Sequence, residues 1–182
     1  NNSDWINRMI YGENLLVLQA LLAGDPKTDL HSMRGKIDLI YIDPPFDSKA
    51  DYKTKIPLED GEIEQQPRVI QQFAYSDTWK NGTSSYLEMI VPRLILMKEL
   101  LSERGSIYVQ IDWHVGHYVK IILDAIFGKE FFINEIIWRR TFSHGDVGQG
   151  AKHLGRLHDT ILVYGKTNNY IFNNVYTPYA ES

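Results

Sequence analysis

The sequence contains no cysteine, which excludes a disulfide framework, a thiolate nucleophile and a cysteine-ligated zinc site. It also lacks any apolar run near the roughly 20 residues that a membrane-spanning helix needs, because polar residues interrupt every candidate. Its first residues carry neither the basic nor the apolar region of a secretory leader. These absences are typical of a cytoplasmic protein with no membrane segment. The first residue is asparagine, so we expect a piece of a longer chain.

Charge is distributed unevenly along the 182 residues. The net charge is −4, yet the 139–166 segment holds five basic residues against two acidic ones. That leaves 14 of the 19 basic and 21 of the 23 acidic residues for the rest of the chain. A positive segment in an acidic protein is the pattern of a local polyanion-binding face, although a solvated basic loop gives the same count.

Hydrophobic periodicity divides the chain into alternating strands and helices. Short apolar runs typical of strands cover 37–42, 106–111, 133–138 and 160–164, with a further short run at 8–12. Helical patterns cover 15–22, 85–102 and 115–127, and we expect Asn14 to cap the first and a Ser85–Glu88 capping box to start the second. The stretch 47–84 is polar with little periodicity. This alternation predicts an α/β fold with a doubly wound, mostly parallel sheet in which 37–42 and 106–111 are buried.

The run at 37–42 stops at Asp43-Pro44-Pro45-Phe46. In open α/β sheets, ligands bind outside the carboxyl ends of the strands. The two prolines make this segment a rigid extended rod, since each fixes its own φ and lacks an N–H, so its carbonyls can point at a ligand. A carboxylate at one end and a ring at the other would frame a flat group that bears an amine. For Asp43, and for Asp112 at the end of the 106–111 run, a structural turn is the alternative.

The Asp-Pro-Pro-Phe segment resembles the catalytic motif of the amino-group DNA methyltransferases, which reads Asp/Asn/Ser-Pro-Pro-aromatic. Further segments resemble, in order, the β-class permutation of that family, as in type III modification subunits. They are Gly12-Glu13-Asn14-Leu15, Tyr75-Ser76-Asp77-Thr78-Trp79, the helix from Tyr86 to Leu94, Gly105 to Asp112, Phe127-Gly128, Ile136 to Arg140 and His158 to Tyr164. The resemblance runs from about residue 8 to residue 166 and implies a Rossmann-like methyltransferase fold.

The resemblance implies roles for the four residues of the motif. Members of the family flip the target base out of the duplex, because its amine cannot be reached inside the stack. Asp43 and the carbonyl of Pro44, held rigid by Pro45, would accept hydrogen bonds from the exocyclic amine, and Phe46 would stack on the base. The amine nitrogen would then face the methyl group of S-adenosylmethionine, with no covalent intermediate. Aspartate in the first position favours adenine over cytosine.

The same resemblance assigns residues outside the motif. Glu13 and Asn14, with Asp43, fall where the family binds the cofactor, although Glu13 also suits the first turn of a helix and Asn14 its cap. Trp138 and His158 match the target-base pocket, with core packing for the tryptophan and a structural role for the histidine as alternatives.

Four basic residues in the 139–166 segment are expected to contact DNA phosphates, with a solvated surface as the alternative. They are Arg139, Arg140, Lys152 and Arg156. Three histidines share the segment: His144, His153 and His158. Their spacings of nine and five residues come without a carboxylate framework, so we expect no metal site.

One family feature is missing from the sequence. The family binds S-adenosylmethionine largely through a Phe-x-Gly-x-Gly turn, which in the β-class order follows the target-recognition region, and no such turn is present. We therefore expect 1–166 to be the catalytic part of the methyltransferase domain, incomplete in this chain, and 167–182 to begin the recognition region. Double-stranded DNA is the expected partner, and the type III members imply a restriction subunit and a homodimer.

Two other functional classes stay open at this point. The chain is then either a catalytically inactive DNA-binding or assembly fragment, or an amino-group methyltransferase that acts on cytosine N4, RNA or protein glutamine. Similar motifs serve those substrates in the wider family.

Overall fold

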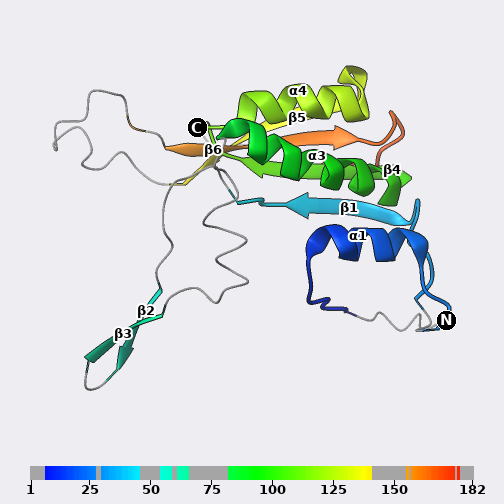
Figure 1. The fold of residues 1–182 in the computed structure, drawn as a ribbon. Helices are drawn as coiled ribbons and strands as arrows, with labels where there is room; N and C mark the ends of the chain where they lie inside the picture. The colour runs from blue at the N-terminus through cyan, green and yellow to red at the C-terminus, as the bar shows by residue number, and fades with distance from the viewer. Residues whose placement is uncertain are drawn as a thin grey trace.

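The computed structural model describes residues 7–27, 30–45, 54–58, 61–65, 82–140, 155, 157–174 and 176 (Figure 1). The elements in chain order are α1 (Asn14–Ala23), β1 (Ile37–Ile42), β2 (Thr54–Leu58), β3 (Gly61–Gln65), α3 (Thr83–Leu100), β4 (Leu101–Ile111), α4 (Gly116–Phe127), the short 3₁₀ helix η1 (Lys129–Phe131), β5 (Phe132–Arg139) and β6 (His158–Gly165). The α/β class is confirmed. Each predicted helix is present, and so is each predicted strand except the one at 8–12, which has no regular secondary structure.

The main sheet has the strand order β1-β4-β6-β5. Strands β1 and β4 pair in parallel, whereas β4 with β6 and β5 with β6 pair antiparallel. The sheet described is therefore mixed, not mostly parallel. For two successive strands to pair in parallel, the chain must cross back to the end of the sheet at which the first strand began. Strand β6 instead starts where β5 stops, with Arg139 opposite His158, so this pair has the geometry of a hairpin.

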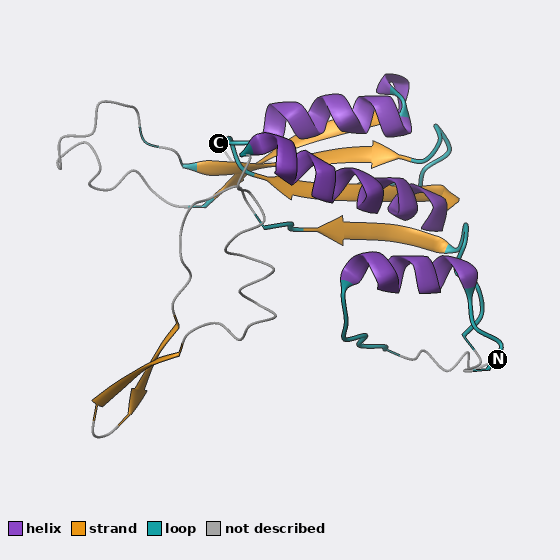
Figure 2. Ribbon diagram, viewed as in Figure 1, coloured by secondary structure: helices purple, strands orange, loops and turns teal. Residues whose placement is uncertain are grey.

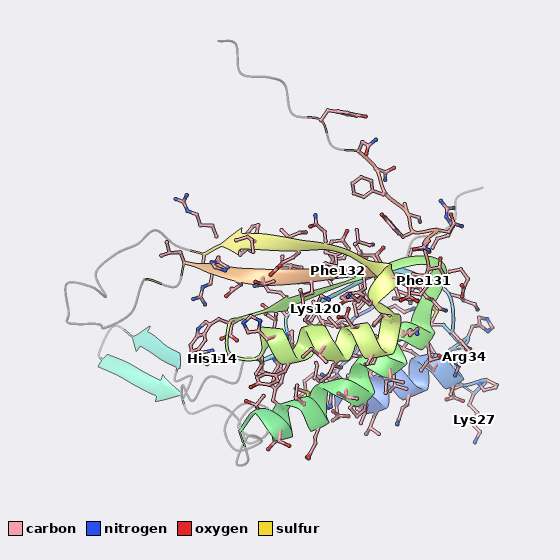
Figure 3. The ribbon with its side chains drawn as sticks, turned by 90° about the horizontal axis from the view of Figure 1, so that it is seen from above. Lys27, Arg34, His114, Lys120, Phe131 and Phe132 are labelled. Carbon is pink, nitrogen blue, oxygen red and sulfur yellow. The ribbon has the colours of Figure 1, made fainter. Side chains whose placement is uncertain are left out.

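All three described α-helices lie side by side on one face of the sheet (Figures 2 and 3). Their apolar faces and one face of the strands form the core, which includes the following buried residues. They are Tyr86, Ile90, Leu94, Leu101, Ile107, Val109, Ile111, Val115, Val119, Leu123, Phe127, Leu162 and Tyr164. The predicted doubly wound arrangement needs helices on both faces, so among the described residues only half of it is seen.

The second face of the sheet, called here the open face, carries exposed side chains. In β1, Ile40 and Ile42 pack on the core, while Leu39 and Tyr41 are 63% and 55% exposed. The prediction that 37–42 is buried on both faces is therefore wrong for β1. It holds better for β4, in which Ile107 and Val109 are fully buried and Tyr108 between them is only partly exposed.

Two predicted helix starts differ from the structure. Glu13, not Asn14, is the N-cap of α1, and its Oε2 accepts a hydrogen bond of 3.0 Å from the Leu16 N–H. A longer carboxylate at this position reaches the backbone as the usual short caps do. Helix α3 begins at Thr83 after Gly82, with no side-chain cap, so Ser85 lies inside the helix rather than in a capping box.

The polar stretch 47–84 contains an antiparallel hairpin that the sequence analysis missed. Strands β2 and β3 pair from Thr54 opposite Gln65 to Leu58 opposite Gly61. Two residues separate the strands, Glu59 and Asp60, and the Asp60-Gly61 pair is a turn signal that could have found the hairpin. Pro57 is an unusual residue for a strand, because proline cannot donate to a ladder and is confined to edge strands.

A polar cluster fixes α4 to the sheet. Asp124 accepts hydrogen bonds from the Tyr164 hydroxyl at 2.6 Å and from Lys120 Nζ at 2.8 Å. The same ammonium lies 4.4 Å from the centre of the Phe132 ring, toward which Lys120 points in Figure 3. Desolvation raises the pKa of Asp124, but the hydrogen bonds from Lys120 and Tyr164 outweigh it and leave that pKa below its ordinary value.

Candidate active site

The strand directions gather the predicted polar segments at one edge of the sheet. Strands β1 and β4 run in parallel, so Asp43 and Asp112 follow them at the same edge. Strand β6 is antiparallel to β4 and starts there, and β5 ends there. We call this the carboxyl edge, made of residues 43–45, 112–114, 138–140 and 158–159. Figure 1 shows that α1 begins at the same end of the molecule as β1 ends.

The Asp-Pro-Pro segment leaves β1 as a partly buried rod. Pro44 is buried and Pro45 half-buried, while Asp43 keeps its side chain exposed. The carboxyl is still partly shielded from water by its neighbours. This partial desolvation raises the pKa of Asp43, and the negative charge of Asp159 raises it further. A carboxylate with a raised pKa is a better hydrogen-bond acceptor and proton acceptor than an ordinary one. Phe46 lies outside the described residues.

A chain of polar side chains crosses the open face next to Asp43. The Tyr41 hydroxyl donates to Oε1 of Gln110, whose Nε2 donates to Oδ2 of Asp159 at 3.5 Å. Oδ1 of Asp159 lies 3.4 Å from Nη1 of Arg140. The four residues come from β1, β4, β6 and the end of β5, so the chain spans every strand of the sheet. Sequence reasoning gave no role to Tyr41, Gln110 or Asp159.

Asp112 serves the turn after β4. Its carboxylate accepts a hydrogen bond of 3.0 Å from the His114 N–H and pairs with the His114 ring. The Trp113 and His114 rings stack with their centres 3.7 Å apart. Asp112 is buried. Two roles were predicted for Asp112, a ligand contact and a structural turn, and its contacts in the structure are those of a turn.

The two residues expected in the base pocket lie on different faces of the sheet. Trp138 pairs with Asp159 and His158 pairs with Arg139. Successive side chains of a strand point to opposite faces. Trp138 is therefore on the open face, where it is exposed, and His158 is on the helix face. Trp138 thus shares its face with Asp159 and the polar chain, and His158 does not.

Glu13 and Asn14 both bind Arg93 of α3. Nε of Arg93 donates to Oδ1 of Asn14 at 2.6 Å, and its Nη2 pairs with Oε1 of Glu13. Desolvation raises the pKa of Glu13, but hydrogen bonds from the backbone of Leu16 and Leu15 and the charge of Arg93 bring it below its ordinary value. Glu13 is therefore an ionised acceptor, and three of the roughly four lone pairs on its carboxylate already accept hydrogen bonds, from Leu16, Leu15 and Arg93. The sequence analysis gave Arg93 no role, because an arginine in a helical pattern carries no signal that it contacts the start of another helix.

Of the expected phosphate contacts, Arg139 and Arg140 lie at the carboxyl edge, and Lys152 and Arg156 lie outside the described residues together with His144 and His153. Within the described ranges, no three His, Asp or Glu side chains are grouped as a metal site would need. No described helix is long and apolar enough to cross a membrane.

Comparison with known proteins finds similarity over most of the chain. The profile of a family described as DNA methylase matches residues 37–181. The type II methyltransferase M.EcaI of Enterobacter cloacae is 32% identical over 167 residues, which are 92% of this chain and 31% of that protein. The Mod subunit of the type III restriction-modification enzyme StyLTI of Salmonella typhimurium is 28% identical over 91% of this chain and 25% of its own length.

Among solved structures, this chain is similar to the PvuII DNA methyltransferase, described as cytosine-N4-specific. It is 15% identical with a TM-score of 0.49, and the match covers 87% of this chain and 48% of that one. The matched part of this chain corresponds to a third or less of the length of M.EcaI and of the StyLTI Mod subunit.

Proposed function

This chain belongs to the DNA methylase family, and on that premise we propose that it carries the catalytic part of an amino-group DNA methyltransferase. The reaction proposed is transfer of a methyl group from S-adenosylmethionine to the exocyclic amine of an adenine in double-stranded DNA. The single observation that carries the proposal is the Asp43-Pro44-Pro45 rod at the carboxyl edge, with a carboxylate whose pKa is raised by burial and by Asp159.

The geometry of the rod suits an amine substrate. The carboxylate of Asp43 and the carbonyl of Pro44 would accept its two N–H groups, which turns the nitrogen lone pair out of conjugation with the base. S-adenosylmethionine, when bound, supplies an electrophilic methyl carbon on a sulfonium. The amine nitrogen would take up this methyl group, and Asp43 would accept the proton that the nitrogen gives up along their hydrogen bond. Phe46 is proposed to stack on the flipped base, and Trp138 on the open face is proposed as a further residue of the base pocket. His158 lies on the helix face and is the weaker candidate for that pocket.

Cofactor and DNA contacts are proposed from residues of the same chain. Glu13 is an ionised acceptor at the start of α1, at the end of the molecule where β1 ends, and its remaining lone pair would accept from a cofactor hydroxyl or amine. Asn14 beside it is the weaker candidate, since its side-chain oxygen accepts from Arg93. Four cations are proposed to hold the phosphates: Arg139, Arg140, Lys152 and Arg156.

The organisation of the whole protein is also a proposal. We propose that residues 1–166 are the catalytic part, that 167–182 begin a target-recognition region, and that the longer protein supplies the rest of the cofactor site. The StyLTI relative is a Mod subunit of a type III restriction-modification enzyme. We therefore propose a restriction subunit and a second copy of the protein as partners.

The test uses the longer parent protein with labelled S-adenosylmethionine and unmethylated DNA, followed by digestion to nucleosides. We expect label on adenine, lost in Asp43→Ala and kept in Asp38→Ala. Asp38 is a matched control, because it lies on the same strand at the opposite end and bonds only Ser102 among the described side chains. Label on cytosine would show that the methylated base is cytosine and not adenine. A folded parent that binds cofactor and labels neither base would overturn the proposal in favour of an RNA or protein substrate.

A further inference from the structure

Asp159 is a buried carboxylate that affects the pKa of Asp43 but has no contact with base or cofactor in the proposed reaction. It is 3% exposed, and its Oδ1 makes no hydrogen bond within the described part of the chain. Among the described residues, the Asp159 carboxylate pairs with Arg140, whose Nη1 lies 3.4 Å from Oδ1. A carboxylate loses much hydration when it is buried, and a buried pair with a long contact is a weak source of stability. Stability therefore does not explain why a carboxylate is buried at this position.

Arg140 is held at two points although it follows the last residue of β5. Its backbone N–H donates to the Leu157 carbonyl at 2.8 Å, which extends the β5–β6 ladder by one bond. Its side chain meets Asp159 through Nη1 and remains 46% exposed. A guanidinium has five N–H donors in a fixed plane, so one contact with a carboxylate leaves the others for a second anion.

Asp159 is itself held by the polar chain of the open face. Gln110 uses both ends of its amide, accepting from Tyr41 and donating to Asp159, so its orientation is fixed. This row of polar side chains links Arg140 at one side of the sheet to β1, which Asp43 follows, at the other. A shift of Asp159 would move the anchor of Arg140 relative to the Asp-Pro-Pro rod.

We propose that Asp159 is a positioning residue, which holds the Arg140 guanidinium at the carboxyl edge so that it binds a phosphate of the DNA strand whose base enters the site. The inference rests on the proposed function, because it takes the polyanion to be the substrate DNA. An arginine oriented in advance gives up less side-chain entropy when it binds, which favours the bound state. Asp159 acts through Arg140 and touches neither base nor cofactor.

The test measures binding of a short fluorescent DNA duplex to the chain over a series of salt concentrations. Each phosphate contact contributes about 0.9 to the slope of log K against log salt. We expect Asp159→Asn and Arg140→Gln each to weaken binding and to reduce the slope by about 0.9, and the double variant to lose no more than either alone. Glu99→Gln is the matched control, since it breaks a pair with Arg34 at the opposite end of the molecule from His114 (Figure 3).

The sign of the Asp159→Asn effect separates positioning from simple repulsion. Removal of a negative charge that only repels DNA would tighten binding, and tighter binding or an unchanged slope would overturn the inference. If the asparagine variant does not fold, Gln110→Met tests the same step, because it removes the hydrogen bond to Asp159 and keeps the charge. We expect Gln110→Met to reduce the slope, and an unchanged slope would again overturn the inference. An unaltered chain without salt-dependent binding would instead contradict the DNA contacts of the proposed function.

Discussion

Asp43 stands among groups that favour its protonated form. Burial removes water from the carboxyl, and Asp159 adds a negative charge nearby, so the pKa of Asp43 is raised. Within the described part of the chain, the guanidinium of Arg140 pairs with Asp159 and not with Asp43. The proposed reaction needs the ionised form as acceptor, so its rate would rise with pH through the pKa of Asp43.

The first prediction concerns this coupling between two carboxylates. Asp159→Asn removes a negative charge that disfavours ionisation of Asp43, so we expect the pKa of Asp43 to fall. Carbon-detected NMR titration of the Asp43 carboxyl in the isolated chain measures this directly. Asp38→Asn, at the other end of β1, is the control and should leave the titration unchanged. An Asp43 pKa that is the same in Asp159→Asn and the unaltered chain would refute the coupling.

At the scale of elements, Arg93 joins the start of α1 to the middle of α3. It donates to Asn14 and to the Met89 carbonyl, both at 2.6 Å, and pairs with Glu13. We expect Arg93→Met to lower the free energy of unfolding by about 1–3 kcal/mol, since it removes a charged hydrogen-bond donor shared by three acceptors. Urea denaturation measures the loss.

Arg34→Met is the matched control for that experiment. Arg34 also pairs with a glutamate, but its side chain is 58% exposed and water replaces the lost contact. An exposed pair contributes less than about 1 kcal/mol. Equal losses in the two variants would show that Arg93 does not join the helices more strongly than a surface pair does.

Gly105 occupies a tight position where β1 meets β4. The register shifts there, because Ile37 pairs with Leu101 but Leu39 pairs with Ser106. A Cβ at Gly105 would lie 2.7 Å from the Ile37 carbonyl oxygen and 2.8 Å from a Leu101 methyl carbon. Gly105 falls between the helix predicted to end at 102 and the strand predicted to start at 106, and the structure has a bulge inside one longer strand there instead. Hydrophobic pattern alone does not distinguish a turn from a bulge, since both leave a glycine before an apolar run.

We expect Gly105→Ala to destabilise the fold by about 1–3 kcal/mol, as overpacking against a backbone carbonyl does. Gly116→Ala is the same substitution at the first residue of α4, where the nearest atom to the added Cβ is Ile111 Cγ2 at 3.4 Å. Alanine is favoured over glycine in helices, so this control should be neutral or stabilise by up to about 1 kcal/mol. Urea midpoints of the two variants should therefore move apart. A midpoint for Gly105→Ala at or above that of the unaltered chain would contradict the close contact.

At the scale of the whole molecule, the sequence predicted the helices and strands, which depend on local pattern. It missed the strand directions and the side-chain contacts, which depend on how distant segments pair. Apolar runs and stop residues located the helices and the strands of the main sheet, and the strand after which Asp43 follows. The antiparallel direction of β6 was missed. It depends on the basic segment that connects β5 to β6, and hydrophobic periodicity does not indicate the direction of a strand. Asp159 and Gln110 were missed for a related reason. Each is one polar residue in or beside an apolar strand, and only the sheet order β4-β6 makes them neighbours.

The exposed open face also bears on cofactor binding. Leu39, Tyr41 and Trp138 are exposed on it, and the three described α-helices all lie on the other side. The sequence contains no Phe-x-Gly-x-Gly turn, so the backbone N–H groups that such a turn presents to a ligand are not supplied by this chain. Asp43 and Glu13 would then contribute only part of the contacts that S-adenosylmethionine needs.

We therefore expect the isolated chain to bind S-adenosylmethionine weakly or not at all in a calorimetric titration, while the longer parent binds it. Asp43→Ala in the parent separates the contribution of this chain from that of the remainder, and it should reduce affinity without abolishing it. A micromolar dissociation constant for the isolated chain would contradict the idea that the site is shared. It would place the whole cofactor site on the residues between Glu13 and the carboxyl edge, with the open face left for another partner.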